Sequence, residues 1–542
     1  MQNKVEAAQQ GSTQSSINAE ELLAFFRCRR LPYLDRVGPI QAKLPPEDLL
    51  EQWRRDRQTL VSRVFEQFPG ERIEAGNGAV LAAMSQGVQY IYGGGIQAEL
   101  FIERVIERAA AVDVTALECE TELSKAPRSS PGIPDPTDPI DRDTATADNT
   151  LPAEFEAIRV SSSLDLLIRD QPLPTKSQPS LRHFYLPAQI RIGKRPKPEY
   201  ELLLALQAEL LGTLQGTTPK RGILILKGGK WHPIHLGRRR EQVRQLIREY
   251  LLTLDQPDPP QVFMARSRCH LCHWREHCRQ LNATSQPLSL LPGVTGSRYP
   301  LLQEAGIESV EALANAHLET LQAIPKLGAA VALQLKRQAH ATLTQQPVWI
   351  QQEPFPKTAV EIYFDIEADP RHNVAYLLGL LVVEQTQDAD AFRYHSCLAT
   401  TPEEEGQVWQ QFLRLTAQHP EAPIYHFHGF EVQTCQRLGQ QYNTDPRQLR
   451  QLLKRFVDLH EWVQRSVVLP IESYSLKNIA RWLGFEWRIP DASGAQSIYW
   501  YSQWLETQDR DFLERSVIYN EDDCRATHRL KDWLAKGADS NP

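Results

Sequence analysis

The sequence contains no long hydrophobic segment. No run of about 18 apolar residues occurs, so we expect no membrane-spanning helix. Residues 1–16 are polar and lack the apolar core of a secretory signal, which predicts a cytoplasmic protein. Positive charge is also in deficit, because 60 Lys and Arg face 67 Asp and Glu and leave a net charge of −7. Any binding to nucleic acid must therefore depend on local basic patches.

Cysteine is scarce, with eight in 542 residues. In a long cytoplasmic chain this excludes a disulfide framework, and clustered cysteines there indicate a metal site. Cys269, Cys272 and Cys278 have the spacing Cys-x2-Cys-x5-Cys, which can offer three thiolates to one centre. Cys28 is the candidate fourth ligand of an iron–sulfur cluster. Histidines of the same loop could instead complete a zinc site, so both cofactors stay open.

The length of the chain predicts several domains, since one core seldom organises so many residues. Shifts in composition predict a disordered N-terminus at 1–18 and an α/β domain at 19–285. A small helical domain at 286–345 and a second α/β domain at 356–536 follow. Residues 125–152 are dense in Pro, Ser, Thr and Asp and predict a disordered insertion in the first α/β domain.

Hydrophobic periodicity gives a coarse order of elements. We expect helices up to about residue 97, then a long helix followed by a strand over 94–118. Strands are expected at 157–160, 164–168, 184–192 and 222–226, with helices at 200–214 and 241–254. This order is typical of an α/β domain. From 359 to about 534, strands and helices alternate again.

Short helices with glycine-bearing turns are expected at 286–345. Gly293 and Gly296 lie in the first of these turns. The segment resembles helix-hairpin-helix modules, which hold a DNA phosphate with backbone N–H groups at a helix start. A helical spacer is the alternative.

Two acidic motifs carry the strongest functional signal. An apolar run ends in Asp365-Ile366-Glu367, and alternation along a strand would place both carboxylates on one face. Glu431 follows a second strand, and Tyr519 and Asp523 are four residues apart on an expected helix. Carboxylates that converge in this way suit Mg²⁺ or Mn²⁺, and a pair of such ions is a common device for phosphodiester cleavage.

The cysteine pattern resembles the iron–sulfur RecB-type nucleases over residues 20–280. The resemblance implies a restriction-endonuclease-like α/β fold and a [4Fe–4S] cluster on Cys28, Cys269, Cys272 and Cys278. That family cuts DNA at a PD-(D/E)xK site. Asp165 matches its aspartate, but Gln189 and Arg191 stand where a second acid and a lysine are expected. A neutral amide cannot replace a carboxylate at a divalent metal, so we expect this second site to be degenerate and the domain to bind DNA or to act as a scaffold.

The acidic motifs resemble the DEDD exonucleases of the ribonuclease H-like superfamily. Asp365 and Glu367 match the first motif, and Tyr519 and Asp523 match the third. The middle motif departs, because Glu431 stands where Asp is usual. The order of parts resembles a family of RecB-like nucleases with a fused C-terminal exonuclease domain. The resemblance implies that Asp365, Glu367, Glu431 and Asp523 hold two divalent ions.

These patterns predict a metal-dependent 3′→5′ exonuclease that acts on DNA, above all on single-stranded ends. RNA stays open as a substrate, and a helicase or another repair protein is a candidate partner. The basic stretch Arg238-Arg239-Arg240 is expected to contact the nucleic-acid backbone. A non-catalytic nucleic-acid-binding or repair scaffold protein is the alternative.

Overall fold

A computed structural model describes most of the chain. The described residues are 16–45, 48–73, 76–103, 155–170, 183–254, 256, 258–264, 266–269, 272–282, 288–352, 354–385, 390–490 and 492–537. The expected insertion at 125–152 and most of the expected disordered N-terminus lie outside them. Two compact units are present, one formed by 1–43 and 53–262 and the other by 44–52 and 263–542.

The first unit contains two sheets with a buried helix between them. The larger sheet has the strand order β2-β3-β6-β7-β8-β9 and the smaller has β1-β5-β4. Helix α5 contacts β4 of the smaller sheet and β7 and β8 of the larger, and its residues from Leu202 to Leu211 are all buried. The strands are β1 (Ser16–Asn18), β2 (Glu71–Ile73), β3 (Tyr90–Gly93), β4 (Gly95–Glu103), β5 (Phe155–Ser163), β6 (Leu166–Asp170), β7 (Phe184–Ile190), β8 (Arg221–Ile225) and β9 (Trp231–His235).

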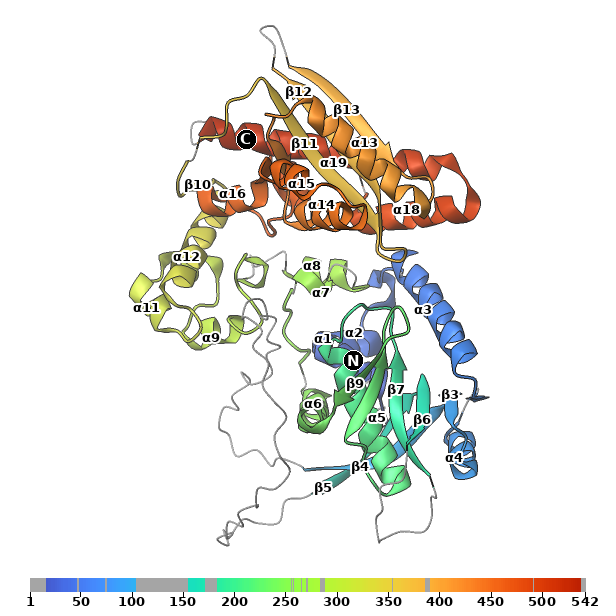
Figure 1. Cartoon of the computed structure of the whole chain (residues 1–542). Helices are drawn as coiled ribbons and strands as arrows, with labels where there is room; N and C mark the ends of the chain where they lie inside the picture. Colours follow the sequence, from blue (N-terminus) through green and yellow to red (C-terminus); the bar gives the residue numbers. More distant parts are fainter. Residues whose placement is uncertain are drawn as a thin grey trace, which may run out of the picture. The chain divides into compact units, whose positions relative to one another are not determined.

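The helices of this unit frame the sheets (Figure 1). They are α1 (Ala19–Arg27), α2 (Arg30–Val37), the part of α3 (Asp48–Gln67) from Trp53 on, α4 (Asn77–Gln86), α5 (Pro198–Gln215) and α6 (Gly237–Leu254). The expectation of a long helix over 94–118 is wrong for its described part, because β4 occupies 95–103 and pairs antiparallel with β5. Residues 104–118 lie outside the described part. The expected all-helical region before Gln97 also contains β2 and β3.

The second unit begins with short helices. They are α7 (Arg266–Cys269), α8 (Arg275–Asn282), α9 (Tyr299–Glu304), α10 (Val310–Asn315), α11 (Leu318–Ala323) and α12 (Ala329–Thr344). Helices α9 to α12 enclose their own apolar core, which includes Leu302, Leu313, Leu321 and Leu335. The expected linker after Thr344 contains β10 (Val348–Trp349), which pairs with β16 (Val467–Val468).

A sheet with the strand order β13-β12-β11-β14-β15 forms the centre of the C-terminal domain. Its strands are β11 (Val360–Asp369), β12 (Val374–Glu384), β13 (Ala391–Leu398), β14 (Ile424–His426) and β15 (Phe456–Asp458). β11 is antiparallel to β12 and parallel to β14. The helices are α13 (Glu405–Gln418), α14 (Phe430–Gln441), α15 (Pro446–Leu453), α16 (Leu459–Ser466), α17 (Leu476–Trp482), α18 (Gly494–Thr507) and α19 (Arg510–Lys536).

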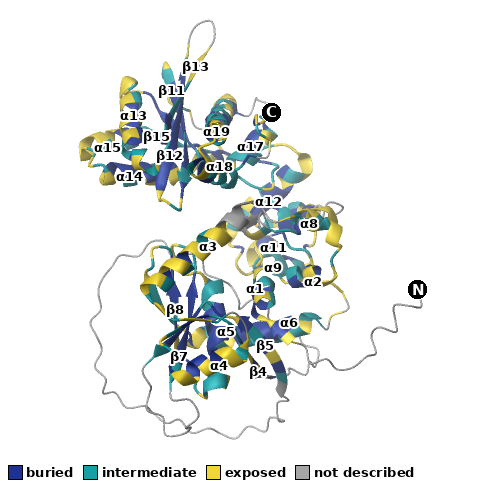
Figure 2. Ribbon diagram, turned by 90° about the vertical axis from the view of Figure 1, so that its right-hand side faces the viewer, coloured by how far each residue is buried: buried dark blue, intermediate teal, exposed yellow. Residues whose placement is uncertain are grey.

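Alternation along β11 decides which helix each side chain meets. Phe364 packs with Phe412 of α13 on one face of the sheet, whereas Tyr363 packs with Leu530 of α19 on the other. Asp365 and Glu367 share the face of Tyr363 because side chains alternate along a strand. The buried strands lie between the helices in Figure 2. Asp365 and Glu367 therefore lie on the face of the sheet that α19 covers.

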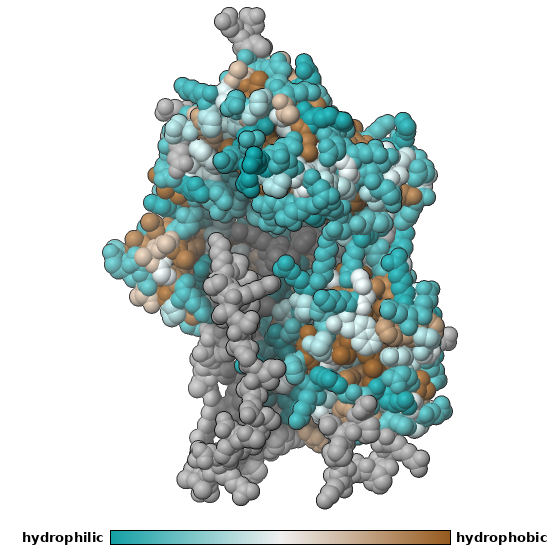
Figure 3. Space-filling model, viewed as in Figure 1, coloured by the Kyte–Doolittle hydropathy of each residue, from teal (hydrophilic) through white to brown (hydrophobic). Residues whose placement is uncertain are grey.

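Much of the visible surface is hydrophilic (Figure 3). Within the described residues, no helix is both long and apolar enough to span a membrane.

Candidate active site

Three carboxylates meet between β11 and α19. Asp365, Glu367 and Asp523 each offer an oxygen, and these oxygens lie within 4.8 Å of one another. Glu367 is only 6% exposed, whereas Asp365 and Asp523 retain partial contact with solvent. The sequence expectation that these three acids converge therefore agrees with the geometry.

Burial and mutual repulsion raise the free energy of the cluster when its carboxylates are ionised. Burial is the main cause that raises the pKa of Asp365, and the charges of Asp523, Glu367 and Glu431 raise it further. The pKa of Glu367 is raised for the same two kinds of reason. Burial also raises the pKa of Asp523 to about 7, against hydrogen bonds from Trp487 and Tyr519 that lower it. Such a cluster needs protons or a cation to neutralise it.

Glu431, the fourth acid predicted from the sequence, does not belong to the group of three whose oxygens lie within 4.8 Å of one another. It lies in the first turn of α14, is 4% exposed and raises the pKa of Asp365 electrostatically. Its Oε2 is buried and accepts no hydrogen bond among the described residues. The Nδ1 of His426 lies 3.5 Å from this oxygen but bonds the carbonyl of His428 at 2.7 Å. Burial raises the pKa of Glu431, while the neighbouring His426 and a hydrogen bond from the backbone lower it.

Each of the three acids accepts a hydrogen bond from a side chain that the sequence motifs did not reveal. Asn520 Nδ2 donates to Asp365 Oδ2 at 2.7 Å, and Trp487 Nε1 donates to Asp523 Oδ1 at 2.7 Å. Ser497 hydrogen-bonds Glu367. Asn520 could have been found from the helix, since it follows Tyr519 directly. Trp487 and Ser497 come from other segments and had no local signal.

Tyr519 contacts the cluster as its spacing predicts. It is 7% exposed and shares a hydrogen bond with the Asp523 carboxylate. Burial and the charge of Asp523 raise the pKa of its phenol, so Tyr519 remains a neutral donor.

The neighbouring acids have other partners. Asp522 accepts from the backbone N–H and Nε of Arg488 at 2.9 and 2.7 Å. Asp458 caps α16 through the N–H of His460 and also accepts from the N–H of His428. These contacts agree with the expectation that Asp523, not Asp522, joins the cluster and that Asp458 is a helix cap.

The second predicted site has no carboxylate pair. Asp165 forms an ion pair with Arg57 and accepts from the N–H of Ile190 at 2.9 Å. Arg191 NH1 lies 3.6 Å from Asp165, and its Nε donates to Gln189 at 3.2 Å. Guanidinium groups of Arg57 and Arg191 therefore stand beside the Asp165 carboxylate.

Among the described residues, no three cysteine sulfurs lie within 4.8 Å of one another. Cys28 belongs to the first unit and Cys269, Cys272 and Cys278 to the second. Neither the iron–sulfur nor the zinc expectation gains support from this arrangement.

The predicted nucleic-acid contacts are placed as follows. Arg238 is exposed at the start of α6, whereas Arg239 pairs with Glu201 and Arg240 with Glu209. Gly293 adopts φ +92° and its carbonyl accepts from Arg298, while Gly296 lies near Phe263. Two of the three arginines are thus already neutralised.

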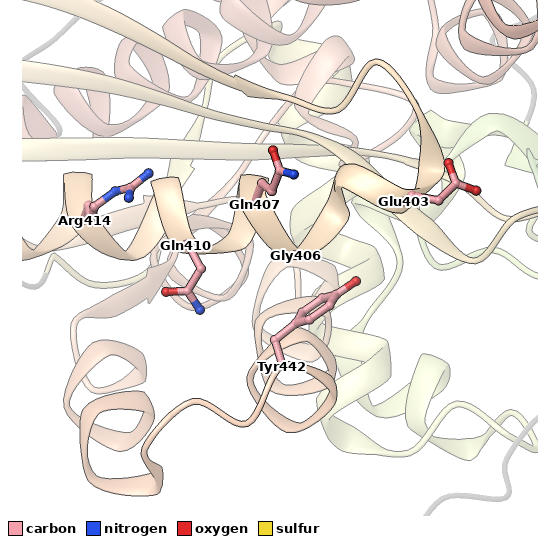
Figure 4. Close-up of a pocket in the computed structure, with 6 residues that line it drawn as sticks. All are labelled: Glu403, Gly406, Gln407, Gln410, Arg414 and Tyr442. Carbon is pink, nitrogen blue, oxygen red and sulfur yellow. The ribbon is translucent and has the colours of Figure 1, made fainter.

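A pocket of about 530 Å³ is lined mainly by residues of α13 (Figure 4). Its lining includes none of the four acids predicted from the sequence. The lining residues are Glu403, Gly406, Gln407, Gln410, Arg414 and Tyr442.

Comparison with known proteins identifies one part of the chain. Residues 362–535 match the RNase H superfamily. The match spans the sheet from β11 to β15 and nearly all of α19, and so contains all four acids. No curated protein matches the chain. The RNase H-like domain indicates a nucleic-acid hydrolase, and domains of this kind use divalent metals.

Proposed function

We propose that the protein is a divalent-metal-dependent phosphodiester hydrolase that degrades DNA from its 3′ end. The observation that carries the proposal is the convergence of Asp365, Glu367 and Asp523 within 4.8 Å inside an RNase H-like domain. Hard carboxylate oxygens in this number suit Mg²⁺ or Mn²⁺. The raised pKa values of all three acids fit a site completed by cations.

The four acids would hold the ions, and the protein supplies their orientation. Divalent cations in such a site provide an activated water and stabilise charge on the leaving oxygen. Asn520 engages one oxygen of Asp365, and Trp487 engages one oxygen of Asp523. Tyr519 hydrogen-bonds Asp523, and when cations occupy that carboxylate its neutral phenol would donate to the water or to the scissile phosphate instead.

A non-catalytic nucleic-acid-binding protein is the second candidate. The residue that favours it is Glu431, which is longer by one methylene than the aspartate usual in the DEDD pattern. Its raised pKa and its contact with His426 could hold it away from a metal.

Digestion of end-labelled DNA with Mg²⁺ or Mn²⁺ tests the proposal. The wild type should shorten a 5′-labelled single strand progressively, and Asp365→Asn should lower the rate by at least about 100-fold, because a ligand charge is lost. Asp165→Asn is the matched control and should digest at the wild-type rate. Absence of digestion with either metal would favour the non-catalytic candidate. The same assay on RNA decides the substrate class.

We further propose, from the cysteine spacing alone, that Cys28, Cys269, Cys272 and Cys278 join in one centre. Anaerobically purified protein should then be brown and contain iron. Colourless protein with bound zinc would favour the zinc alternative, and protein with neither metal would exclude both.

A further inference from the structure

Basic residues lie at one end of the strands of the larger sheet in the first unit, and this end is called an edge below. β7 and β8 are parallel, so their carboxyl ends lie at the same edge, and β6 begins there because it is antiparallel to β7. Asp165 precedes β6, the segment 191–197 follows β7, and the turn 226–230 follows β8. The N–H of Lys227 donates to the carbonyl of Gly193 at 3.2 Å, which joins the two segments.

The cations at this edge come from three segments. Residues 194–197 are all exposed, as is Lys230. Arg57 of α3 reaches the same edge, because its Nε donates to the carbonyl of Ile190 at 3.2 Å. We call the set the β7–β8 basic edge, and it consists of Arg57, Arg191, Lys194, Arg195, Lys197, Lys227 and Lys230.

The described segments at this edge carry four acids, Asp56, Asp165, Glu199 and Glu201, against the seven cations. Asp165 is already paired with Arg57. Glu199 and Glu201 lie in the first turn of α5, and Glu201 pairs with Arg239. The edge therefore keeps an excess of positive charge in a molecule whose net charge is −7.

An aromatic ring lies within the basic edge. The guanidinium carbon of Arg191 is 5.7 Å from the ring centroid of Tyr200, and Nζ of Lys197 is 5.8 Å from it. Exposed cations interleaved with an aromatic ring are the usual composition of a groove that follows a single nucleic-acid strand.

We propose that the β7–β8 basic edge binds the phosphate backbone of a single nucleic-acid strand. The pairing of Asp165 with arginines removes the anionic charge that would attract a metal ion and repel a phosphate. The edge would therefore bind the strand without cleaving it. The inference rests on the proposed function only in that it takes nucleic acid as the substrate.

Binding to a labelled strand tests the inference in full-length protein. Binding is measured in EDTA on the Asp365→Asn background, so that the probe, a fluorescein-labelled oligodeoxynucleotide of about 20 nucleotides, stays intact. Arg195→Ala with Lys197→Ala should raise Kd at least about 10-fold and reduce the slope of log K against log salt by about 1.4, or 0.7 for each lost phosphate contact.

The matched control removes two exposed cations from the opposite end of the β8–β9 hairpin. Lys220→Ala with Arg221→Ala changes the net charge equally and should leave Kd within about twofold. Equal loss in both variants, or loss only in the control, would overturn the inference. Far-UV circular dichroism and the melting temperature verify that both variants are folded.

Binding and cutting can fail independently. If the wild type digests nothing but the Arg195 and Lys197 variant loses binding, the basic edge stands and the hydrolase proposal falls. If the wild type digests and this variant binds like the control, the hydrolase stands and the basic edge falls.

Discussion

At the scale of single residues, the RNase H-like site depends on groups that orient its acids. Trp487 is 5% exposed and donates its indole N–H to Asp523 Oδ1. Hydrogen bonds to metal ligands of this kind fix carboxylate orientation, and their loss costs about 10- to 100-fold in metal affinity. Trp487→Phe keeps the ring but removes the donor. We predict that it lowers Mn²⁺ affinity by at least about 10-fold, measured by the electron paramagnetic resonance signal of unbound Mn²⁺.

Trp504 provides the matched control. It is 8% exposed and also donates its indole N–H, but to the carbonyl of Thr400. Trp504→Phe should cost about 1 kcal/mol of stability and leave Mn²⁺ affinity unchanged. Equal Mn²⁺ affinities of the two variants would show that Trp487 does not position Asp523.

The raised pKa of Asp523 predicts how pH affects the metal-free protein. Between its usual value of 3.8 and about 7, the folded protein holds a proton that the unfolded chain has released. Folded stability in EDTA therefore falls as pH rises through this window. Asp523→Asn removes this penalty, so at pH 7.5 it should melt at a higher temperature than the wild type in EDTA. The difference corresponds to about 1–4 kcal/mol.

Added Mg²⁺ should stabilise the wild type more than Asp523→Asn, so that the wild type then has the higher melting temperature. The stabilising effect of Mg²⁺ on the wild type, measured as the rise in melting temperature, should be larger at pH 7.5 than at pH 5.5, because protons compete for the ligands. Asp523→Asn should show little of this rise. An equal rise in both proteins would mean that the ion binds elsewhere.

The sequence predicted the acids better than their partners. Asp365 with Glu367, and Tyr519 with Asp523, are fixed by local periods of two and four residues. The hydrogen bond from Trp487 spans 36 residues and depends on how the segment after α17 folds back on α19. The arginine at Asp165 comes from 108 residues earlier in the chain. No local sequence pattern predicts contacts between residues so far apart in the chain.

At the scale of elements, the close approach of β12 and α19 places Asn520. Gly379 is opposite Asp365 in the β11–β12 pair, and a Cβ on it would overlap Asn520 Oδ1. Asn520 is fully buried and donates to Asp365, so it cannot move aside without releasing that acid. We predict that Gly379→Ala lowers the rate of DNA digestion by at least about 100-fold and lowers the melting temperature, as overpacked cores do.

Gly494 is the control for this prediction. It begins α18, and a Cβ there meets nothing within 4 Å. Gly494→Ala should keep the wild-type rate and gain up to about 1 kcal/mol in stability. Full activity of Gly379→Ala would show that the rate does not depend on the position of Asn520.

Element prediction failed where local propensity and tertiary pairing disagree. Residues 95–103 precede a run rich in Ala, Glu and Arg, which favours a helix. Their burial nevertheless alternates, with Ile96, Ala98, Leu100 and Ile102 buried and Phe101 exposed. That period of two satisfies pairing with β5, which begins 52 residues after β4 ends. Strand formation thus depends on a partner that a local window does not contain.

At the scale of the whole molecule, the proposed cutting site and the proposed binding edge belong to different units. Asp365, Glu367, Glu431 and Asp523 lie in residues 263–542, and the β7–β8 basic edge lies in residues 53–262. A negative net charge of −7 gives no general attraction for nucleic acid, so we expect the basic edge to supply a local attraction.

This division predicts that the effect of the basic edge depends on substrate length. A strand of about three nucleotides offers few phosphates to share between the acids and the basic edge, whereas one of about 20 can contact several cations. Arg195→Ala with Lys197→Ala should therefore raise KM for the long strand at least about 10-fold at unchanged kcat, since only binding shared by ground and transition states is lost. For the short strand, both constants should equal those of the wild type. A loss of kcat on the short strand would mean that these cations act at the acidic site itself, and equal KM values on the long strand would mean that the first unit does not hold the substrate during cleavage.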